Sequence, residues 1–472
     1  MNFHSSSRNF KTFAYFFYAI VATIAFWYWH VDEHYQITEL ASYKLGYTPA
    51  ENLAWEFHSR MRSGILPLIV YLISKLTLAI GWFHPFIPGA ICRVISSLLF
   101  IYVYLRLLDY IQIDKSSLLY KIAILFWILP TIMVRFSPES VGCSLFILGF
   151  LLIEKSKHEG RYLTYIGIGF IWGIAFYIRM HMAILIATFI IYNLILRSIG
   201  IRILSYIFLG FLISSVFELV VNYWLYDALV WSPYYYFIEN VIHNRASHFG
   251  LMPWYYYFTE TLKNLFYPIG ALLWLGVGYF TYRYPKHIFT WFFWIFFLMH
   301  SFIGHKEYRF LFPIFPFFVL IALKSLDVLS QKAYYNNFVK SVWILNIILL
   351  PSCILIQTFN PLNWLQLYSV SKQYKTIYTD YPSPYAIDTR FYNVRPYFWK
   401  HPLCVIKEYA IADSAEIDNI SVYISTKDLG NQIKIGNSLL TKSFQTIPKG
   451  VNDRLPISVK NSIDYLYVYK VL

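Results

Sequence analysis

The chain is dominated by a series of long apolar runs. An α-helix needs about 20 mostly apolar residues to cross the roughly 30 Å hydrocarbon core of a bilayer. Twelve runs of this kind precede residue 360, at residues 12–30, 66–81, 89–108, 118–134, 139–154, 162–178, 183–196, 203–223, 265–282, 288–304, 309–324 and 340–358. Because a soluble globule cannot bury so much hydrocarbon, the runs predict an all-α polytopic membrane protein.

The charge content agrees with this class. Charged residues are 14% of the 472 residues, against about 25% in soluble domains. The net charge of +14 does not indicate nucleic-acid binding, because lysine and arginine of membrane proteins mostly occupy cytoplasmic loops or contact lipid phosphates. The four cysteines form no pattern typical of a metal site or a disulfide framework.

Positive charge on the short connections predicts the orientation of the chain. Basic residues gather at residues 8–11, 155–157, 197–202, 283–286 and 324–340, and such clusters favour the cytoplasmic side. They place the N-terminus inside and the C-terminal tail outside, which requires an odd number of crossings. We therefore expect one short run between residues 66 and 108 to be re-entrant or not a separate span, and predict 11–13 transmembrane helices.

The composition changes near residue 360, which predicts two domains. Residues 1–359 are expected to form the membrane domain, with outward loops at 31–65 and 224–264. Residues 360–472 are more polar and contain alternating segments such as Ile420–Ser425, and alternation of this kind is typical of short strands. We expect a small C-terminal α/β extramembrane domain there.

The first outward loop begins with two adjacent acids, Asp32 and Glu33. Acidic side chains are costly to hold beside lipid, so such a pair points to function, although Asp32 is equally suited to capping the next helix. An apolar stripe at 37–43 ends at Gly46, and Thr48–Glu51 matches a capping box ahead of a second short helix. These patterns predict two amphipathic helices on the membrane surface.

Three basic side chains close the first outward loop: His58, Arg60 and Arg62. Two roles are open for them. They can anchor the loop to lipid phosphates, or they can recognise a phosphate-bearing substrate.

The second outward loop combines aromatic rings with polar side chains. An interfacial aromatic belt accounts for most of its tryptophans and tyrosines. It does not account for the polar residues between 239 and 248, among them Asn240 and Asn244. Rings beside amide, hydroxyl and imidazole groups are typical of a sugar-binding surface.

A charged block, His305–Phe310, separates two nearly pure hydrocarbon runs. If the block is helical, His305 and Arg309 share one face and together can hold a phosphodiester, with Glu307 orienting them. The alternative is a self-neutralising ion cluster that merely ends a helix.

Together these motifs resemble glycosyltransferase family 22, which contains dolichyl-phosphate-mannose-dependent mannosyltransferases of N-glycan and GPI-anchor assembly. His305–Phe310 is similar to the family's HKE-x-RF signature, and Tyr308 looks most like the GPI third-mannose branch. Further similar elements are Asp32–Gln36, Trp55–Glu56, Arg60–Pro67, Arg135–Glu139, Arg179, Asn240, Asn244, Gly250 and Pro253–Tyr257. The chain departs from the family at Asn222, Tyr256 and Met180, where Asp, Trp and Pro are usual.

The resemblance implies a GT-C fold and a metal-independent, inverting transfer of mannose from a polyprenyl-phosphate donor. Inversion by direct displacement needs a general base, which we assign to Asp32 with support from Glu33. Cations must meet the departing phosphate. The residues expected to do so are His305, Lys306 and Arg309, with Arg60, Arg62 and Arg179 as weaker candidates and Glu307 and Tyr308 in support. The acceptor is expected to contact Asn240, Asn244, Trp254 and Tyr257.

The expected partners are polyprenyl- or dolichyl-phosphate-mannose, a glycan or glycolipid acceptor and membrane lipids. No cofactor, metal or nucleic acid is expected. The site would face the periplasm from a bacterial inner membrane, or the lumen of the endoplasmic reticulum. The alternatives are a lipid-linked glycosyltransferase with a different sugar, a transporter or flippase, and a non-catalytic scaffold. A transporter would favour repeated halves and ionisable residues at helix midpoints, whereas the polar clusters here lie at helix ends.

Overall fold

The structure is a computed structural model, and it describes residues 3–25, 30, 32–82, 84–156, 161–196, 199–329, 334–359, 368, 372–379, 405–408, 421–425, 429–435, 438–445 and 467–471. The chain divides into two compact units. The first consists of Met1–Ala25, Ser59–Ile69 and Ala90–Cys353, and the second of Phe26–His58, Val70–Gly89 and Ile354–Leu472. The first outward loop up to His58 therefore belongs to the same unit as the C-terminal tail.

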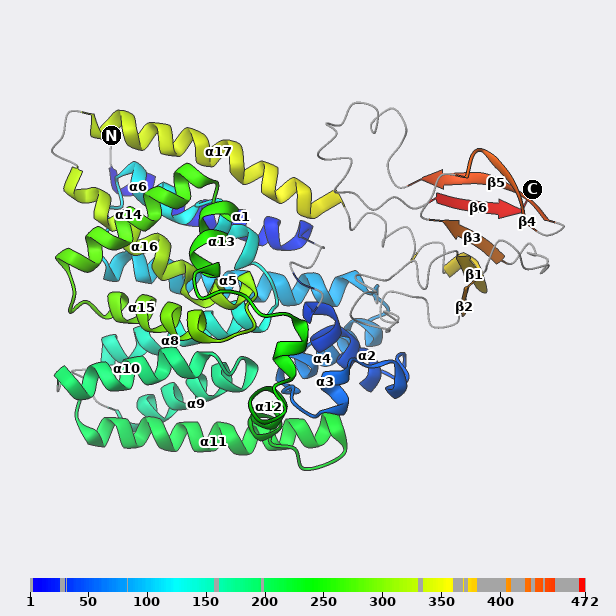
Figure 1. Cartoon of the computed structure of the whole chain (residues 1–472), viewed down its shortest axis with the longest axis horizontal. Coiled ribbons are helices and arrows are strands. Elements are labelled where there is room, and N and C mark those ends of the chain that lie inside the picture. Colours follow the sequence, from blue (N-terminus) through cyan, green and yellow to red (C-terminus); the bar gives the residue numbers. More distant parts are fainter. Residues whose placement is uncertain are drawn as a thin grey trace. The chain divides into compact units, whose positions relative to one another are not determined.

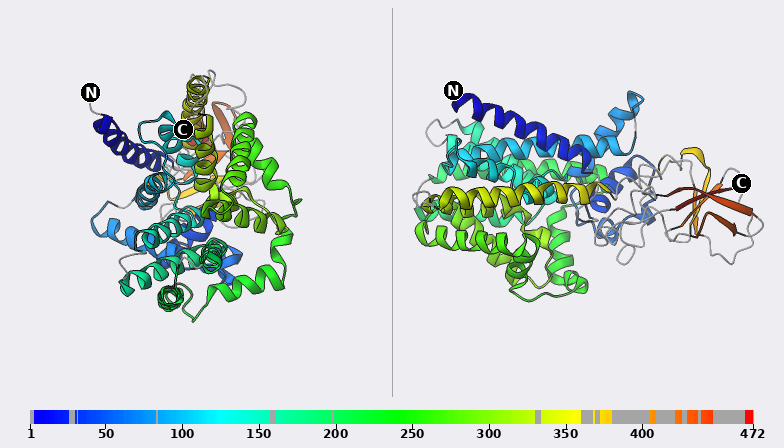
Figure 2. Two further views of the ribbon diagram at one scale, coloured as in Figure 1. Left: turned by 90° about the vertical axis from the view of Figure 1, so that its left-hand side faces the viewer. Right: turned by 90° about the horizontal axis from the view of Figure 1, so that it is seen from above.

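Helices make up most of the described part of the first unit (Figures 1 and 2). Those that lie in it or enter it are α1 (Phe3–Ile24), α4 (Ile65–Ala79), α5 (Phe86–Tyr110), α6 (Leu118–Ile124), α7 (Ile128–Ile132), α8 (Pro138–Ser156), α9 (Tyr162–Ile178), α10 (Met182–Leu196), α11 (Ile201–Tyr226), α12 (Ser232–Phe237), η3 (Ile238–Ile242), η4 (Arg245–Phe249), α13 (Tyr256–Asn264), α14 (Tyr267–Arg283), α15 (Ile288–Phe302), η5 (Tyr308–Ile314), α16 (Phe315–Ser325), η6 (Leu326–Leu329) and α17 (Tyr335–Phe359). Each of the predicted apolar runs coincides with one or two of these helices, which confirms the all-α membrane class.

Two predicted runs are split by features that hydropathy does not reveal. The run at 118–134 breaks between α6 and α7, where the Asn346 side chain of α17 accepts the N–H of Trp127 and donates to the carbonyl of Leu125, each at 2.8 Å. One amide thus pairs a carbonyl and an N–H at the break, and the hydroxyls of Tyr18 and Tyr104 donate to the carbonyls of Ile124 and Ala123. The run at 309–324 begins as the 3₁₀ helix η5, which contains Pro313, and continues as α16.

Close backbone contact holds the centre of the first unit together. In Figure 1, α8, α9, α10 and α11 run side by side, and α9 packs on both α8 and α11. At the contact between α9 and α11, a side chain on Gly169 would collide with the backbone of Ile207, and one on Gly210 with that of Ile166. Small residues at such crossings let membrane helices pack by direct contact.

Four helical segments in the described residues are long and apolar enough to cross a bilayer: Phe86–Tyr110, Ile201–Tyr226, Tyr308–Ser325 and Tyr335–Ile354. Five further apolar helices are shorter. Along the middle of α11 the exposed large apolar side chains recur in adjacent pairs one turn apart: Phe208 and Leu209, Leu212 and Ile213, and Val216 and Phe217. This stripe is suited to face lipid, and the chain is a multi-pass membrane protein. The count of 11–13 crossings stays a prediction.

The first outward loop is helical, as predicted, but its second helix is capped differently. Its elements are η1 (His34–Thr38), α2 (Glu39–Lys44), η2 (Ala50–Asn52) and α3 (Trp55–His58). The first two form one continuous helical stretch that ends at Lys44, and Gly46, with a φ of +81°, turns the chain just after it. The capping box predicted at Thr48–Glu51 is wrong, because the Thr48 hydroxyl contacts Glu39 and Ser42 instead, each at 2.7 Å.

The C-terminal tail contains the sheet that the alternating segments predict. Its strands are β1 (Thr376–Thr379), β2 (Val405–Glu408), β3 (Ser421–Ser425), β4 (Gln432–Ile435), β5 (Ser438–Gln445) and β6 (Tyr467–Val471), in the order β2-β1-β3-β6-β5-β4. β1 is parallel to β2 and β3, and the other pairs are antiparallel. Both faces carry buried side chains, with Tyr423 and Tyr469 on one face and Val422 and Val468 on the other.

Candidate functional site

Three charged side chains from distant parts of the sequence meet inside the first unit. Glu139 lies in the first turn of α8, Arg179 directly follows α9, and Arg309 lies in η5. Arg179 Nη2 lies 3.0 Å and Arg309 Nη1 3.8 Å from Oε1 of Glu139, and all three side chains are buried. One carboxylate thus holds two guanidinium groups together where water does not screen their repulsion.

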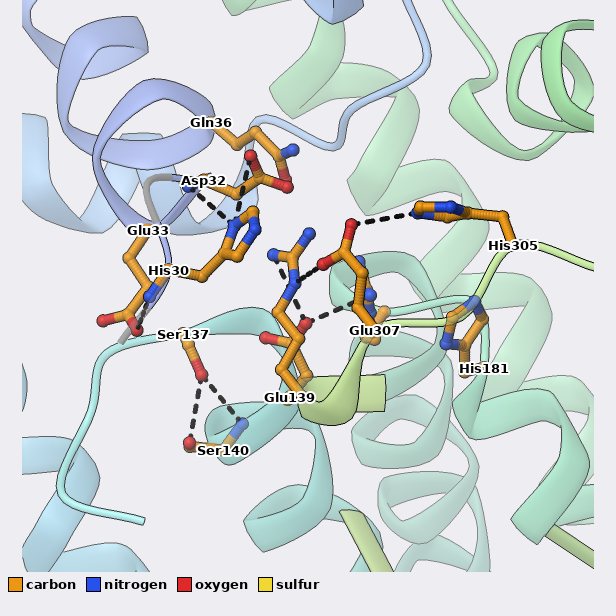
Figure 3. Close-up of polar contacts among 12 residues, drawn as sticks. His30, Asp32, Glu33, Gln36, Ser137, Glu139, Ser140, His181, His305 and Glu307 are labelled. Carbon is orange, nitrogen blue, oxygen red and sulfur yellow. Dashed lines mark hydrogen bonds and ion pairs between the residues drawn. The ribbon is translucent and has the colours of Figure 1, made fainter. Parts of the chain in front are cut away.

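A second carboxylate, Glu307, links Arg309 of this cluster to His305 (Figure 3). Glu307 Oε2 accepts from Arg309 Nε, and its Oε1 lies 3.1 Å from His305 Nε2. The other ring nitrogen, Nδ1, lies 3.0 Å from the carbonyl oxygen of Gly250. Since both nitrogens face acceptors, the imidazolium form fits best, and the contact with Glu307 raises the pKa of His305.

Lys306 is used to hold the second outward loop. Its ammonium donates to the carbonyl of Met252 at 2.9 Å and to that of Ile303, and the side chain is 4% exposed. The Met252 N–H in turn donates to the Gly304 carbonyl at 3.0 Å. The block is therefore not one helix: Glu307 is extended and η5 begins only at Tyr308. The helical face expected for His305 and Arg309 is wrong, and Glu307 brings them together instead.

A small open pocket lies beside the ion cluster, within the first unit. Arg62, Arg179, His181 and Tyr236 supply its polar lining. His181 Nε2 lies 3.3 Å from the Tyr236 hydroxyl, and the Phe310 ring contacts both His181 and Arg179. Burial, and then the charge of Arg179, lower the pKa of His181 well below its usual range, so its imidazole is neutral at pH 7.

The segment that carries Arg60 and Arg62 is fixed on α11. The Gly64 N–H donates to Asn222 Oδ1 at 2.8 Å, and the Tyr226 hydroxyl donates to the Arg62 carbonyl at 2.7 Å. Arg60 has a positive φ of 55° and an exposed side chain. The structure thus places Arg62 at the pocket and Arg60 on the surface.

Asn222 is itself oriented by a buried acid, Glu218. The Asn222 amide donates to Glu218 Oε1, which also accepts from the Ser232 hydroxyl at 2.5 Å. The side chains of Glu218, Asn222 and Ser232 are fully buried. The departure from the family at Asn222 is thus accompanied by a carboxylate one turn earlier in α11.

The two acids of the first outward loop lie in the second unit, and both are buried. Asp32 is 4% and Glu33 is 7% exposed. His30 precedes their helical turn and bonds to both residues. Its ring Nδ1 accepts the backbone N–H of Asp32 at 3.2 Å, and its own backbone N–H donates to Glu33 Oε1 at 3.4 Å (Figure 3). The helix is thus capped by His30, which excludes the simple capping role considered for Asp32.

The π-helical turn η1 after Asp32 is held by a buried network. His34 Nε2 lies 2.7 Å from Glu39 Oε1, and its Nδ1 lies 2.7 Å from the Thr38 hydroxyl. The other oxygen of Glu39 accepts from Thr48. Single π-helical turns are rare and frequently mark functional sites.

The side chains expected to contact an acceptor are in different environments. Trp254 is 71% exposed, Asn244 is exposed in the left-handed region, and Asn240 donates to the Tyr236 carbonyl of its own helix at 3.1 Å. Tyr257, in contrast, is fully buried and packs on Phe297. The Tyr257 ring thus packs in the helix core, away from the surface of the loop that carries Trp254 and Asn244.

Tyr308, expected in support of the phosphate contacts, is also buried. Its ring packs edge-on against Phe312 and Phe315. It therefore anchors η5, the element that carries Arg309.

Sequence reasoning assigned no role to Glu139, His181 or Glu218. For Glu139 a signal existed, because it belongs to the Arg135–Glu139 element that resembles the family. His181 and Glu218 have no such signal, since only the folded chain brings their partners together. Within the described residues, no group of three or more His, Cys, Asp or Glu side chains is placed to hold a metal ion.

The chain is similar in sequence to several curated proteins. The GPI mannosyltransferase 3 of Candida albicans is 27% identical over 297 residues, which cover 61% of this chain and 58% of that protein. The GPI alpha-1,2-mannosyltransferase 3 of Danio rerio is 22% identical over 360 residues, covering 70% of this chain and 65% of that protein. The matched regions thus span less than two thirds of these curated relatives.

A solved structure shares the fold. The crystal structure of ArnT from Cupriavidus metallidurans bound to undecaprenyl phosphate superposes with a TM-score of 0.55 at 11% identity, over 90% of this chain and 93% of that one. This similarity confirms the predicted GT-C fold. A family model, described as the Alg9-like mannosyltransferase family, matches residues 10–399. The chain therefore belongs to the Alg9-like mannosyltransferase family.

Proposed function

We propose that this protein is an inverting mannosyltransferase that uses a polyprenyl-phosphate-mannose donor and a glycan or glycolipid acceptor. Transfer takes place on the periplasmic or lumenal side of the membrane, where the donor's sugar reaches water while its lipid stays in the bilayer. The observation that carries the proposal is the buried cluster of Glu139, Arg179 and Arg309 in a chain of this family.

The cluster has the charge that a lipid phosphate requires. Arg179, Arg309 and protonated His305 face two carboxylates, Glu139 and Glu307, which leaves a net positive charge. Arg62 adds a further guanidinium at the adjoining pocket. A cationic site that is shielded from water stabilises an anion more strongly than the same charges do in bulk solvent.

The chemistry is a single displacement. The acceptor hydroxyl oxygen attacks the anomeric carbon of mannose, the bond between that carbon and the phosphate oxygen breaks, and the electron pair leaves with the phosphate. Asp32 takes the proton of the hydroxyl, with Glu33 beside it in the sequence. A well-placed base contributes about 10²–10⁴-fold to the rate, and one preorganised donor at a developing anion about 2.7–4 kcal/mol.

These roles change the assignment of two side chains. Lys306 already donates to two backbone carbonyls, so it positions the second loop rather than the phosphate. Tyr257 packs on Phe297 in the helix core, so Trp254, Asn240 and Asn244, which are at least partly exposed, are the better acceptor candidates of that loop.

The proposal is tested with purified protein in lipid nanodiscs. The protein is incubated with polyprenyl-phosphate-mannose and a panel of mannose-bearing glycolipids, and the products are identified by mass spectrometry. We expect one acceptor to gain a single α-linked mannose, and Asp32→Asn to lower the rate by about 10²–10⁴-fold without loss of folded protein. Transfer by Asp32→Asn at the wild-type rate would remove the proposed base, and no transfer to any acceptor would contradict the proposed function.

A further inference from the structure

Gln36 lies one helical turn after Asp32, at the centre of η1. It is 4% exposed, as is Asp32. Residues four positions apart in a helical segment lie on the same face, and Figure 3 draws both side chains in the same region of this turn. Neither the sequence motifs nor the proposed reaction gives Gln36 a role, although it occupies the surroundings of the proposed base.

The orientation of the Gln36 amide is fixed by Glu56, a buried acid of α3. Gln36 Nε2 donates to Glu56 Oε1 at 3.1 Å. A carboxylate oxygen only accepts hydrogen bonds, so the nitrogen side of the amide must face Glu56 and the oxygen side must face away. The first outward loop therefore sets the amide in one of its two possible orientations.

This orientation leaves the Gln36 carbonyl oxygen buried without a hydrogen-bond partner among the residues that the structure describes. Buried polar atoms are nearly always paired, and an unpaired one is unfavourable. An acceptor atom held in this way beside the proposed base is available to a donor from outside the chain.

We propose that Gln36 Oε1 accepts a hydrogen bond from a hydroxyl group of the sugar that reacts at Asp32. Gln36 is then a specificity-determining residue, and Glu56 is the positioning residue that orients its amide. The inference rests on the proposed mannosyl transfer and adds to it the recognition of one sugar hydroxyl.

The chemistry of the two neighbouring acceptors selects the ligand. As the proposed base, Asp32 accepts a proton, and the Gln36 carbonyl accepts hydrogen bonds, so neither group acts as a donor to the ligand. A phosphate or carboxylate would repel them, whereas a sugar offers O–H donors on neighbouring carbons. The hydroxyl can belong to the mannose of the donor or to the sugar of the acceptor, and the experiment separates these sources.

The test compares complete and deoxygenated substrates in the full-length protein. Wild type, Gln36→Met and Glu56→Leu are assayed with polyprenyl-phosphate-mannose, with its 2-, 3-, 4- and 6-deoxy forms, and with matching deoxy forms of the acceptor glycan. We expect Gln36→Met to lower kcat/KM about tenfold or more for the complete substrates. One deoxy compound, in either the donor series or the acceptor series, should lower the kcat/KM of the wild type by the same factor. That compound should not lower the kcat/KM of Gln36→Met any further.

Glu56→Leu should reduce the discrimination between that deoxy compound and its parent, because the amide is then free to turn. The matched control is Glu51→Gln, an exposed acid in the same loop, which should leave every ratio unchanged. The discrimination ratio is independent of the amount of folded protein, so a stability loss in a variant does not imitate the effect.

Two results would overturn the inference while the proposed function stands. One is transfer by Gln36→Met at the wild-type rate. The other is an equal loss on every deoxy compound, which would mean that Gln36 acts on the fold or on a bound water. If wild type itself transfers no mannose, the proposed function falls, and the inference falls with it.

Discussion

Removing the charge of Glu139 should destabilise the protein more than almost any other conservative change. Glu139 is 1% exposed and holds Arg179 at 3.0 Å and Arg309 at 3.8 Å. In Glu139→Gln the two guanidinium groups stay buried but lose the carboxylate between them. Breaking a buried ion pair by removing one partner costs about 3–5 kcal/mol, because the remaining charge is uncompensated.

The Coulomb energy supports that magnitude. At an effective dielectric of about 20, two unit charges separated by the 3.0 Å between Glu139 and Arg179 attract by about 5.5 kcal/mol before desolvation is counted. Arg309 keeps its contact with Glu307 in this variant, so we expect a loss near the lower end, about 3 kcal/mol. The exposed Glu51→Gln change should cost less than about 0.5 kcal/mol.

The assay is unfolding in mixed micelles with a rising fraction of SDS, followed by tryptophan fluorescence. A double-mutant cycle with Arg179→Gln isolates the pair: once one partner is gone, removing the other should cost at least about 1 kcal/mol less than it does in the wild type. Additive losses would show that the two side chains do not interact. A Glu139→Gln protein as stable as wild type would refute the buried-charge reasoning altogether.

Four further predictions concern the same unit. Arg309→Ala should raise the KM for the donor about tenfold or more in steady-state assays, and an unchanged KM would remove Arg309 from the phosphate contacts. Glu307 raises the pKa of His305 above its usual 6.5. The positive charge of His305, and its contribution to stability, are therefore complete below pH 6.5 and are lost as the pH rises through the raised pKa. The KM for the donor should rise over the same pH range, and a His305→Gln variant whose KM shows the same step would contradict this. Lys306→Met should speed the hydrogen exchange of the backbone at residues 250–252, because the contacts of Lys306 with the carbonyls of Met252 and Ile303 are lost. Unchanged exchange would mean that Lys306 does not hold the second outward loop in place. Asn346→Leu should cost about 2–3 kcal/mol of unfolding free energy, since both groups at the break between α6 and α7 lose their partner, and a neutral effect would mean that water replaces the amide.

Much of the fold follows from hydropathy, because each membrane helix must be apolar over most of its own length. The apolar runs therefore coincide with the helices, and the alternating tail segments with strands such as β3 and β6. The interruption of a helix, in contrast, can depend on a residue far away in the sequence. The gap between α6 and α7 depends on Asn346, more than 200 positions later, and no periodicity within 118–134 signals it.

The candidate site was less predictable for the same physical reason. The charged block at 305–309 stands out because ions are costly between hydrocarbon runs, but its conformation depends on Gly250 and Met252, which accept from it across the second loop. Likewise, a tyrosine in an aromatic loop can face either water or the core. Tyr257 faces the core because Phe297 of α15 packs over it.

The Asn346 amide, which is bonded to the backbone at the break between α6 and α7, also fixes the rotation of α17 about its axis and its position along that axis. Adding or deleting one residue in α17 before Asn346 would turn this side chain by about 100° and shift it by about 1.5 Å, which would unpair both bonds at once. The same change after Asn346 leaves the lock intact and alters only where the chain leaves α17. Variation in length between the membrane domain and the tail should therefore be tolerated on the C-terminal side of this asparagine and not on the N-terminal side.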